Sequence, residues 1–204
     1  MPATPAVADP RVGVELSEED RSRCALYRVL GKVLVAPPDR VAREALSGLR
    51  GDDSPLGQAL NALAAQAADL QDDLEREYHD LFIGLGRGEL LPYGSFYIAG
   101  FLHERPLARL REELGLFGID RVEGNYEPED HAATLCEIMA GIVGGSLPAP
   151  DGAEQRIFEK HLLPWIGRFF ADLEHANAAS FYRSVGTLGR VFMDIEKEAF
   201  ALPS

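Results

Sequence analysis

The feature that most constrains the fold is a long recurrence of apolar side chains at helical spacing in residues 56–81. Steps of three and four residues separate these positions, which are Leu56, Leu60, Leu63, Ala67, Leu70, Leu74, Tyr78 and Leu81. Such spacing lines one face of a helix. Ser54 before Pro55 fits a helix start, with serine as the N-cap and proline at the first helical position. The pattern predicts one long amphipathic helix ending near Leu81.

The rest of the chain also has helical periodicity. Tyr27, Leu30 and Leu34 share one face of a first helix that Pro37 and Pro38 end, because proline removes a donor and restricts the residue before it. Further helices are predicted over residues 38–49, 95–114, 127–143, 151–173 with a kink or break at Pro164, and 181–195. No β-branched run alternates with polar residues. The expected fold is all-α, a single-domain helical bundle.

Several segments interrupt the helical pattern. Residues 1–16 are rich in proline and alanine and predict a flexible tail that ends at a cap, Ser17, so that residues 17–204 form the domain. Residues 84–95 and 115–126 predict two long loops, and residues 144–150 predict a linker. A compact bundle does not need loops of this length for connectivity, and long ordered loops are often functional.

Charge and composition exclude several classes of partner. The chain has 20 Lys and Arg against 33 Asp and Glu, a net charge of −13, which disfavours nucleic acid and anionic membranes. No apolar run approaches the length of about 18 residues that predicts a membrane span, and residues 1–10 lack the features of a secretory signal. These observations predict a cytoplasmic protein. Cys24 and Cys136 are expected to be buried free thiols.

Motifs for catalysis, metals and nucleotides are incomplete. The five histidines lack the paired Glu-x-x-His units of di-iron bundles, and Ser95 is not in a Gly-x-Ser-x-Gly elbow. The glycines of residues 84–88 have neither the preceding strand nor the spacing of a dinucleotide fingerprint. No catalytic residue, metal or cofactor is predicted. A helical-bundle metalloprotein enzyme stays open as an alternative.

A more informative group surrounds Pro128. Proline at the first helical position would place Asp130 and His131 in the first turn, where the helix dipole favours a carboxylate and lowers the pKa of a histidine. Helix-end stabilisation is the simpler interpretation of these residues. The loop of residues 84–95, however, contains apolar side chains between acidic helices. An apolar floor with an acidic rim suits a peptide that has an apolar run and a basic end.

Three segments together resemble a known family. Glu77 to Gly84 resembles the signature E-Y-x-x-L-F-x-G, Pro92 to Tyr97 resembles P-[WY]-x-S-[VF]-[YW], and Glu127 to His131 resembles E-P-x-D-H. Their order and approximate spacing are similar to those of the TorD/DmsD/NarJ family of molybdoenzyme maturation chaperones. Leu85 and Leu91 stand where family members often have proline.

The resemblance implies an all-helical cytoplasmic chaperone without enzymatic turnover. Its partners would be the twin-arginine signal peptide and the apo form of a molybdopterin-dependent oxidoreductase, whose export it delays until the cofactor is inserted. The chaperone would be a monomer or a homodimer swapped through residues 144–150. The alternative is an adaptor for another amphipathic helix. The peptide-binding residues that the resemblance implies are Leu81, Phe82, Pro92, Tyr93, Pro128, Asp130, His131 and Tyr27.

We expect the apolar segment of the peptide to lie against Leu81, Phe82, Pro92 and Tyr93. Asp130 is then expected to engage a basic residue near that segment. Exposed ion pairs contribute only about 0 to 1 kcal/mol, so apolar burial is expected to supply most of the affinity.

Overall fold

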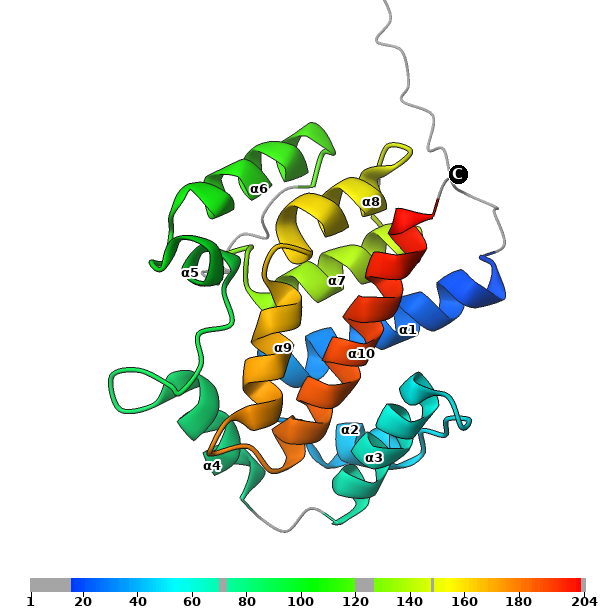
Figure 1. The fold of residues 1–204 in the computed structure, drawn as a ribbon, viewed down its shortest axis with the longest axis vertical. Helices are drawn as coiled ribbons and strands as arrows, with labels where there is room; N and C mark the ends of the chain where they lie inside the picture. The colour runs from blue at the N-terminus through cyan, green and yellow to red at the C-terminus, as the bar shows by residue number, and fades with distance from the viewer. Residues whose placement is uncertain (1–15, 70–72, 120–126, 148, 203–204) are drawn as a thin grey trace, which may run out of the picture.

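A computed structural model describes residues 16–69, 73–119, 127–147 and 149–202, and these residues form helices and turns (Figure 1). Within this described part the only β-type pairing is a single antiparallel bridge between Tyr93 and His131. The helices are α1 (Glu18–Val35), α2 (Arg40–Ser47), α3 (Pro55–Asp69), α4 (Leu74–Tyr78), α5 (Gly94–Ala99), α6 (Arg105–Leu116), α7 (Ala132–Val143), α8 (Ala153–Ile157), α9 (Ile166–His175) and α10 (Phe181–Ala201). Two π-helical turns, η1 (His79–Ile83) and η2 (Phe158–Leu162), continue α4 and α8. The all-α, single-domain prediction is confirmed.

The core lies where α1, α7, α9 and α10 meet. α1 packs against α7, while α10 packs against α9 on one side and α3 on another. In Figure 1, α5 and α6 lie together at one edge of this bundle, on the same side as α8. Cys24 and Cys136 are buried free thiols, as predicted. Aromatic rings fill much of the interior, namely Tyr27, Phe158, Trp165, Phe169, Phe170, Phe181, Tyr182 and Phe192.

Two predicted helix starts are confirmed by their caps. The Ser17 hydroxyl accepts a hydrogen bond from the Asp20 amide at 2.9 Å at the start of α1. The Ser54 hydroxyl likewise accepts from the Gly57 amide at 3.1 Å, with Pro55 as the first residue of α3. These bonds satisfy amides that have no partner inside the helix. The predicted tail falls almost wholly in residues 1–15, outside the described residues.

The single long helix predicted over residues 55–81 is wrong. α3 ends at Asp69, and Asp73 precedes α4 with a non-helical backbone, so two helices share the apolar pattern. Figure 1 shows α3 and α4 on separate sides of α10. Apolar periodicity indicates which side chains are buried in the core. Two helices that contact different parts of the core can each continue the same spacing of three and four residues.

The helix predicted over residues 95–114 is also two. α5 ends at Gly100, which adopts a left-handed conformation with φ of 83°, and α6 begins at Arg105 with Pro106 in its first turn. Glycine tolerates that conformation at a helix end, and proline favours a helix start. Gly100 and Pro106 are therefore signs in the sequence that the helix breaks between them. By contrast, the predicted break at Pro164 is confirmed, because η2 ends at Leu162 and α9 starts at Ile166.

The described parts of the loops are consistent with their prediction. Residues 84–93 form a loop without regular structure. Of the second predicted loop, residues 115 and 116 are instead the end of α6, residues 117–119 follow that helix, and residues 120–126 lie outside the described part. Residues 144–147 form a tight turn after α7, in which the Leu147 amide donates to the Gly141 carbonyl at 3.0 Å. Among the described residues, no helix has the length and apolar character that crossing a membrane requires.

Candidate functional site

The site is built on two chain segments that the fold brings together, residues 92–95 before α5 and residues 127–132 before α7. The Gly94 amide donates to the Asp130 carbonyl at 2.9 Å, and the Ala132 amide donates to the Pro92 carbonyl at 2.8 Å. These bonds flank the bridge between Tyr93 and His131. Gly94 is required at this crossing, because a Cβ there would lie 2.9 Å from the Trp165 indole nitrogen.

Asp130 does not lie within a helix, contrary to prediction. α7 begins at Ala132, four residues after Pro128, because residues 128–130 form a turn in which the His131 amide donates to the Pro128 carbonyl at 3.1 Å. The Asp130 carboxylate reaches across to α5 instead. Its Oδ2 accepts the Ser95 amide at 2.6 Å, and the side chain is only 3% exposed. Asp130 therefore caps a helix other than its own.

His131 is the N-cap of α7. Its Nδ1 accepts a hydrogen bond from the Ala133 amide at 3.0 Å, which fixes that nitrogen as the unprotonated one. Burial lowers the pKa of His131 and outweighs the opposing effect of the Glu127 and Asp130 carboxylates. The predicted direction of the shift is confirmed, but its cause is burial.

Tyr93 is half-buried and held from two sides. Its ring lies edge-on to His131, with 5.0 Å between the ring centroids, and its hydroxyl donates to Glu127 Oε1 at 2.6 Å. Burial raises the pKa of Tyr93, and the Glu127 bond and the nearby Asp130 charge raise it further. The phenol is therefore a fixed, neutral donor, and the exposed part of its ring is apolar surface.

Leu81 and Phe82 lie on η1, and the loop of residues 84–93 connects η1 to this crossing. Leu81 is fully buried, and its carbonyl accepts the Leu90 amide at 2.8 Å, which holds the loop of residues 84–93 against η1. Phe82 is half-buried in an aromatic cluster with Tyr78 and Tyr182, at centroid distances of 5.1 and 5.3 Å. Of the expected apolar floor, Pro92 is buried, whereas Leu85 is fully exposed at the tip of the loop.

Tyr27 lies apart from the other predicted residues. It is completely buried in α1, where its hydroxyl donates to Glu196 Oε2 at 2.8 Å. Arg23 binds the same carboxylate through two nitrogens, at 2.7 and 2.9 Å. Burial and the Glu196 charge raise the pKa of Tyr27 well above its usual value. Tyr27 ties α1 to α10, whereas Pro92, Tyr93, Pro128, Asp130 and His131 form one group.

Glu77 supports the site in a way that sequence reasoning missed. Its carboxylate accepts the amides of Ser180, Phe181 and Tyr182 at 2.7, 3.2 and 2.8 Å, so it caps α10 from α4. The sign of this role in the sequence was the position of Glu77 next to Tyr78. The Tyr78 hydroxyl donates to the Val35 carbonyl at 2.9 Å. Both residues hold η1 in place.

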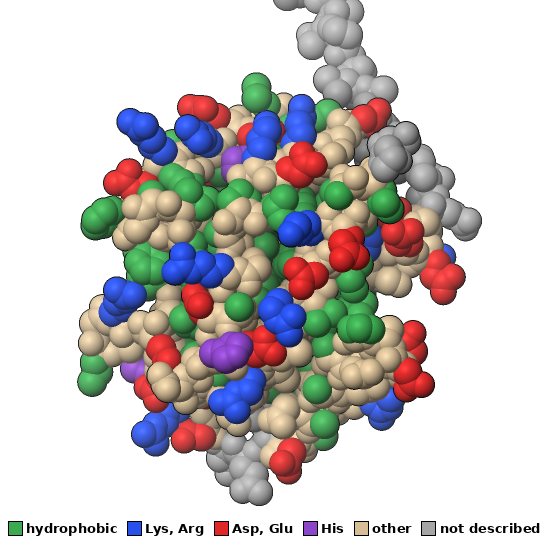
Figure 2. Space-filling model, in the orientation of Figure 1, with side chains coloured by type: hydrophobic (Ala, Val, Ile, Leu, Met, Phe, Trp, Pro, Cys, Tyr) green, Lys and Arg blue, Asp and Glu red, His purple; other side chains and the backbone are tan. Residues whose placement is uncertain are grey.

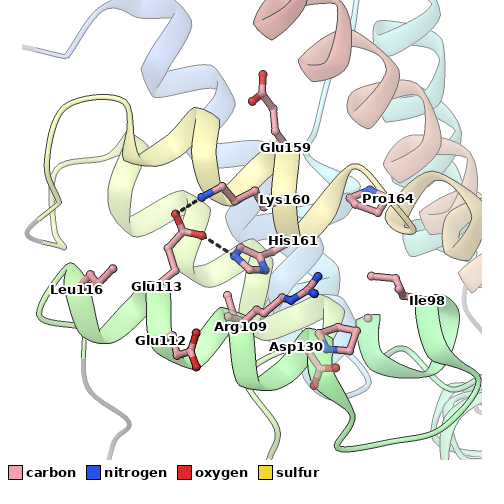
Figure 3. Close-up of a pocket in the computed structure, with 13 residues that line it drawn as sticks. Ile98, Arg109, Glu112, Glu113, Leu116, Asp130, Glu159, Lys160, His161 and Pro164 are labelled. Atoms are coloured by element: carbon pink, nitrogen blue, oxygen red, sulfur yellow. Dashed lines mark hydrogen bonds and ion pairs between the residues drawn. The ribbon is translucent and has the colours of Figure 1, made fainter.

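A cavity of about 530 Å³ opens on the other side of Asp130, between α5 and α6 and the segment from η2 to Pro164 (Figure 3). Glu113 on α6 crosses it to Lys160 Nζ at 2.9 Å and His161 Nε2 at 2.8 Å on η2. Partial burial acts to raise the pKa of Glu113, but the bonds from His161 and Lys160 hold it below the usual value. Of the residues that line this cavity, Asp130 alone was a predicted site residue.

Basic and apolar side chains reach the surface beside this cavity. In Figure 2, Lys and Arg side chains gather along the upper edge over α6 and α8, and apolar side chains reach the surface around α5 and α6. Exposed apolar residues in this region are Ile98, Phe101, Leu102 and Leu116. Over the described residues, no group of three or more His, Cys, Asp or Glu side chains is arranged to hold a metal ion.

Comparison with known proteins gives relatives of one kind. The chain is 29% identical over 198 residues to the chaperone protein TorD of Vibrio cholerae, covering 90% of this chain and 84% of the relative. It is 26% identical to the chaperone protein TorD of Vibrio atlanticus, covering 72% of each chain. A solved structure from Archaeoglobus fulgidus, described as a redox enzyme maturation protein, matches the fold with a TM-score of 0.55, 18% identity, and coverage of 92% of this chain and 99% of that one.

The family model for the nitrate reductase delta subunit matches residues 49–171, which is more than half of the 204 residues. This stretch contains all three motifs on which the sequence resemblance rested. The relatives are named as chaperones, which confirms the expectation of a non-enzymatic protein. The chain therefore belongs to the nitrate reductase delta subunit family, the TorD/DmsD/NarJ family of molybdoenzyme maturation chaperones.

Proposed function

We propose that this protein is a cytoplasmic chaperone that binds the twin-arginine signal peptide of an apo molybdopterin-dependent oxidoreductase and delays its export until the cofactor is inserted. Family membership and the TorD relatives support the maturation role. The observation that carries the peptide-binding role is the crossing of residues 92–95 and 127–132. It presents the half-exposed ring of Tyr93, whose hydroxyl is bound to Glu127.

The peptide contacts the part of the site that is accessible. Phe82, Tyr93 and Pro128 are half-buried, so each offers apolar surface to a ligand. Leu81, Pro92 and His131 are buried and support this surface, whereas Tyr27 is buried between α1 and α10. Burying the apolar run of a signal peptide contributes about 25 cal/mol per Å² before association costs. Charge acts mainly on orientation and encounter rate.

Calorimetric titration with a twin-arginine signal peptide tests the proposal. We expect micromolar or tighter binding, because a run of apolar residues buries against Phe82 and Tyr93. A peptide of the same composition with a scrambled apolar run is the matched control and should not bind. Equal binding of both peptides, or binding of neither across signal peptides from several oxidoreductase classes, contradicts the proposed function.

Replacement of Tyr93 separates apolar contact from charge. Tyr93→Ala should weaken peptide binding about tenfold or more, as expected for loss of a large aromatic anchor, and more than Asp130→Asn at moderate salt. Tyr93→Phe is the control, because it keeps the ring and removes only the bond to Glu127. If Asp130→Asn has the larger effect, the apolar segment is not the main source of affinity.

A further inference from the structure

The cavity beside Asp130 has features of a ligand site that the proposed function does not yet use. Its walls include Ile98 on α5, Leu110 on α6 and Pro164 before α9, and in Figure 3 Ile98 and Pro164 lie across from Arg109. These side chains form an apolar surface beneath a polar rim. An elongated side chain with a charged end fits such a surface, because its methylene groups contact the walls while its head reaches a polar partner.

The charge of the lining favours a cation. Four carboxylates line the cavity, from Glu112, Glu113, Asp130 and Glu159, against the two basic side chains Arg109 and Lys160. Glu113 already binds Lys160 and His161, so Lys160 is neutralised within the protein. The surplus of negative charge remains on the rim and at Asp130.

Two buried polar atoms lack partners in the described part of the chain, one on Asp130, which lines the cavity, and one on Ser95, which follows the lining residue Gly94. Within the described residues, Asp130 Oδ1 and Ser95 Oγ make no hydrogen bond, although Oδ2 of the same carboxylate accepts the Ser95 amide. Buried polar atoms in folded proteins nearly always have a partner. A carboxylate oxygen and a neighbouring hydroxyl oxygen are both acceptors, and a guanidinium presents several donors in a planar fork.

We propose that this cavity is a subsite for one arginine side chain of the bound peptide. The arginine stem lies along Ile98, Leu110 and Pro164, and the guanidinium donates to Asp130 Oδ1 and Ser95 Oγ. The inference rests on the proposed function and adds Ser95 and the cavity walls to it. Both acceptor atoms are shielded from solvent in the free protein, so α5 shifts when the guanidinium enters.

The position of α5 is compatible with such a shift. α5 has only six residues, and Gly100 ends it in a left-handed conformation. Its side-chain tether to the bundle is the Tyr97 hydroxyl, which donates to Asp172 at 3.0 Å, besides the bond from the Ser95 amide to Asp130. Tyr97 also lies 5.6 Å from the Trp165 ring, centroid to centroid.

Calorimetry with modified peptides tests the subsite. The probes are the twin-arginine signal peptide and versions in which each arginine, singly and together, is replaced by citrulline, which keeps the shape and removes the charge. For wild-type protein we expect one of the two replacements to weaken binding about tenfold, as for loss of a charge-assisted hydrogen bond. In Asp130→Asn the same replacement should change affinity by less than about twofold.

Two further variants make the result decisive. Ser95→Ala should weaken binding of the arginine peptide about threefold and leave the affinity for the citrulline peptide unchanged. This variant replaces Asp130→Asn in the test if Asp130→Asn does not fold. Glu75→Gln is the control, because Glu75 is an exposed carboxylate on α4 that does not line the cavity; it should retain the tenfold difference.

The possible outcomes separate the two proposals. A difference between arginine and citrulline peptides that is present in wild type and Glu75→Gln, and absent in Asp130→Asn, supports the subsite. If the peptides bind with equal affinity to wild type, or the difference persists undiminished in both Asp130→Asn and Ser95→Ala, the subsite is wrong while the chaperone function stands. If the unmodified peptide does not bind, both proposals are overturned.

Discussion

Glu77 and Asp130 each cap the start of a helix other than their own, but they use their oxygens differently. Glu77 contacts three amides at the start of α10 with both of its oxygens, at 2.7 to 3.2 Å. Asp130 contacts one amide at the start of α5 with Oδ2 and leaves Oδ1 without a partner among the described residues. The fully bonded carboxylate maintains the scaffold, whereas the partly bonded one retains capacity for a ligand.

The two capped helices, α10 and α5, differ in length and in position. α10 has 21 residues and packs against α9 and α3 in the core. α5 has six residues and lies at the edge of the bundle next to α6. Loss of a cap on α10 affects most of the core, but loss of the cap on α5 affects a peripheral segment.

The largest effect on stability should come from Glu77→Ala. The substitution leaves three amides at the start of α10 without their charged acceptor, and we expect the free energy of unfolding to fall by about 2 kcal/mol. Urea denaturation measures it. Glu75→Ala on the same helix is the control, because Glu75 is exposed, and it should change the value by less than about 0.5 kcal/mol.

Asp130→Ala should destabilise the protein less than Glu77→Ala. It removes a single cap bond to the Ser95 amide, so the free energy of unfolding should fall by about 1 kcal/mol in the same urea experiment. The unpartnered Oδ1 disappears with the side chain, which offsets part of the loss. Equal losses in the two variants would mean that the two carboxylates do not differ in the way we describe.

A smaller, pH-dependent effect is expected from His131, the cap of α7. Its pKa in the folded protein is below the unfolded value of about 6.5, so the unfolded chain binds the proton more readily. The contribution of His131 to stability is therefore complete above about pH 6.5 and is lost as the pH falls toward the folded pKa. Over that range the free energy of unfolding decreases by no more than about 1.4 kcal/mol per pH unit. Urea denaturation between pH 7 and 5 should show a smaller decline in His131→Gln; identical curves would refute this.

Ser95→Ala should have the smallest effect on stability, and in the opposite direction. Because its hydroxyl is buried without a partner among the described residues, removing it should leave the free energy of unfolding unchanged or raise it by up to about 1 kcal/mol. Ser184→Ala is the control. Ser184 is also buried in a helix, but its hydroxyl donates to the Phe181 carbonyl at 2.7 Å, and its loss should lower stability by about 1 kcal/mol.

The agreement between sequence and structure depends on the kind of interaction. Caps at Ser17 and Ser54 and the break at Pro164 were predicted because each depends on neighbours in the sequence. The long helix through residue 81 was wrong because the apolar spacing of α3 continues into α4 after a change of direction. The position of Asp130 was wrong for a related reason, since its partner, Ser95, is 35 residues away.

The sequence by itself determined the all-α class, the exposed and buried faces of most helices, and the three motifs that place the chain in its family. Spacing of apolar residues and local capping chemistry are sufficient for these. Only the tertiary structure decided that Glu77 caps α10, that Tyr27 lies apart from Tyr93, and that a cavity adjoins Asp130. Contacts between distant segments depend on how helices pack, and side-chain periodicity within one segment carries no information about that packing.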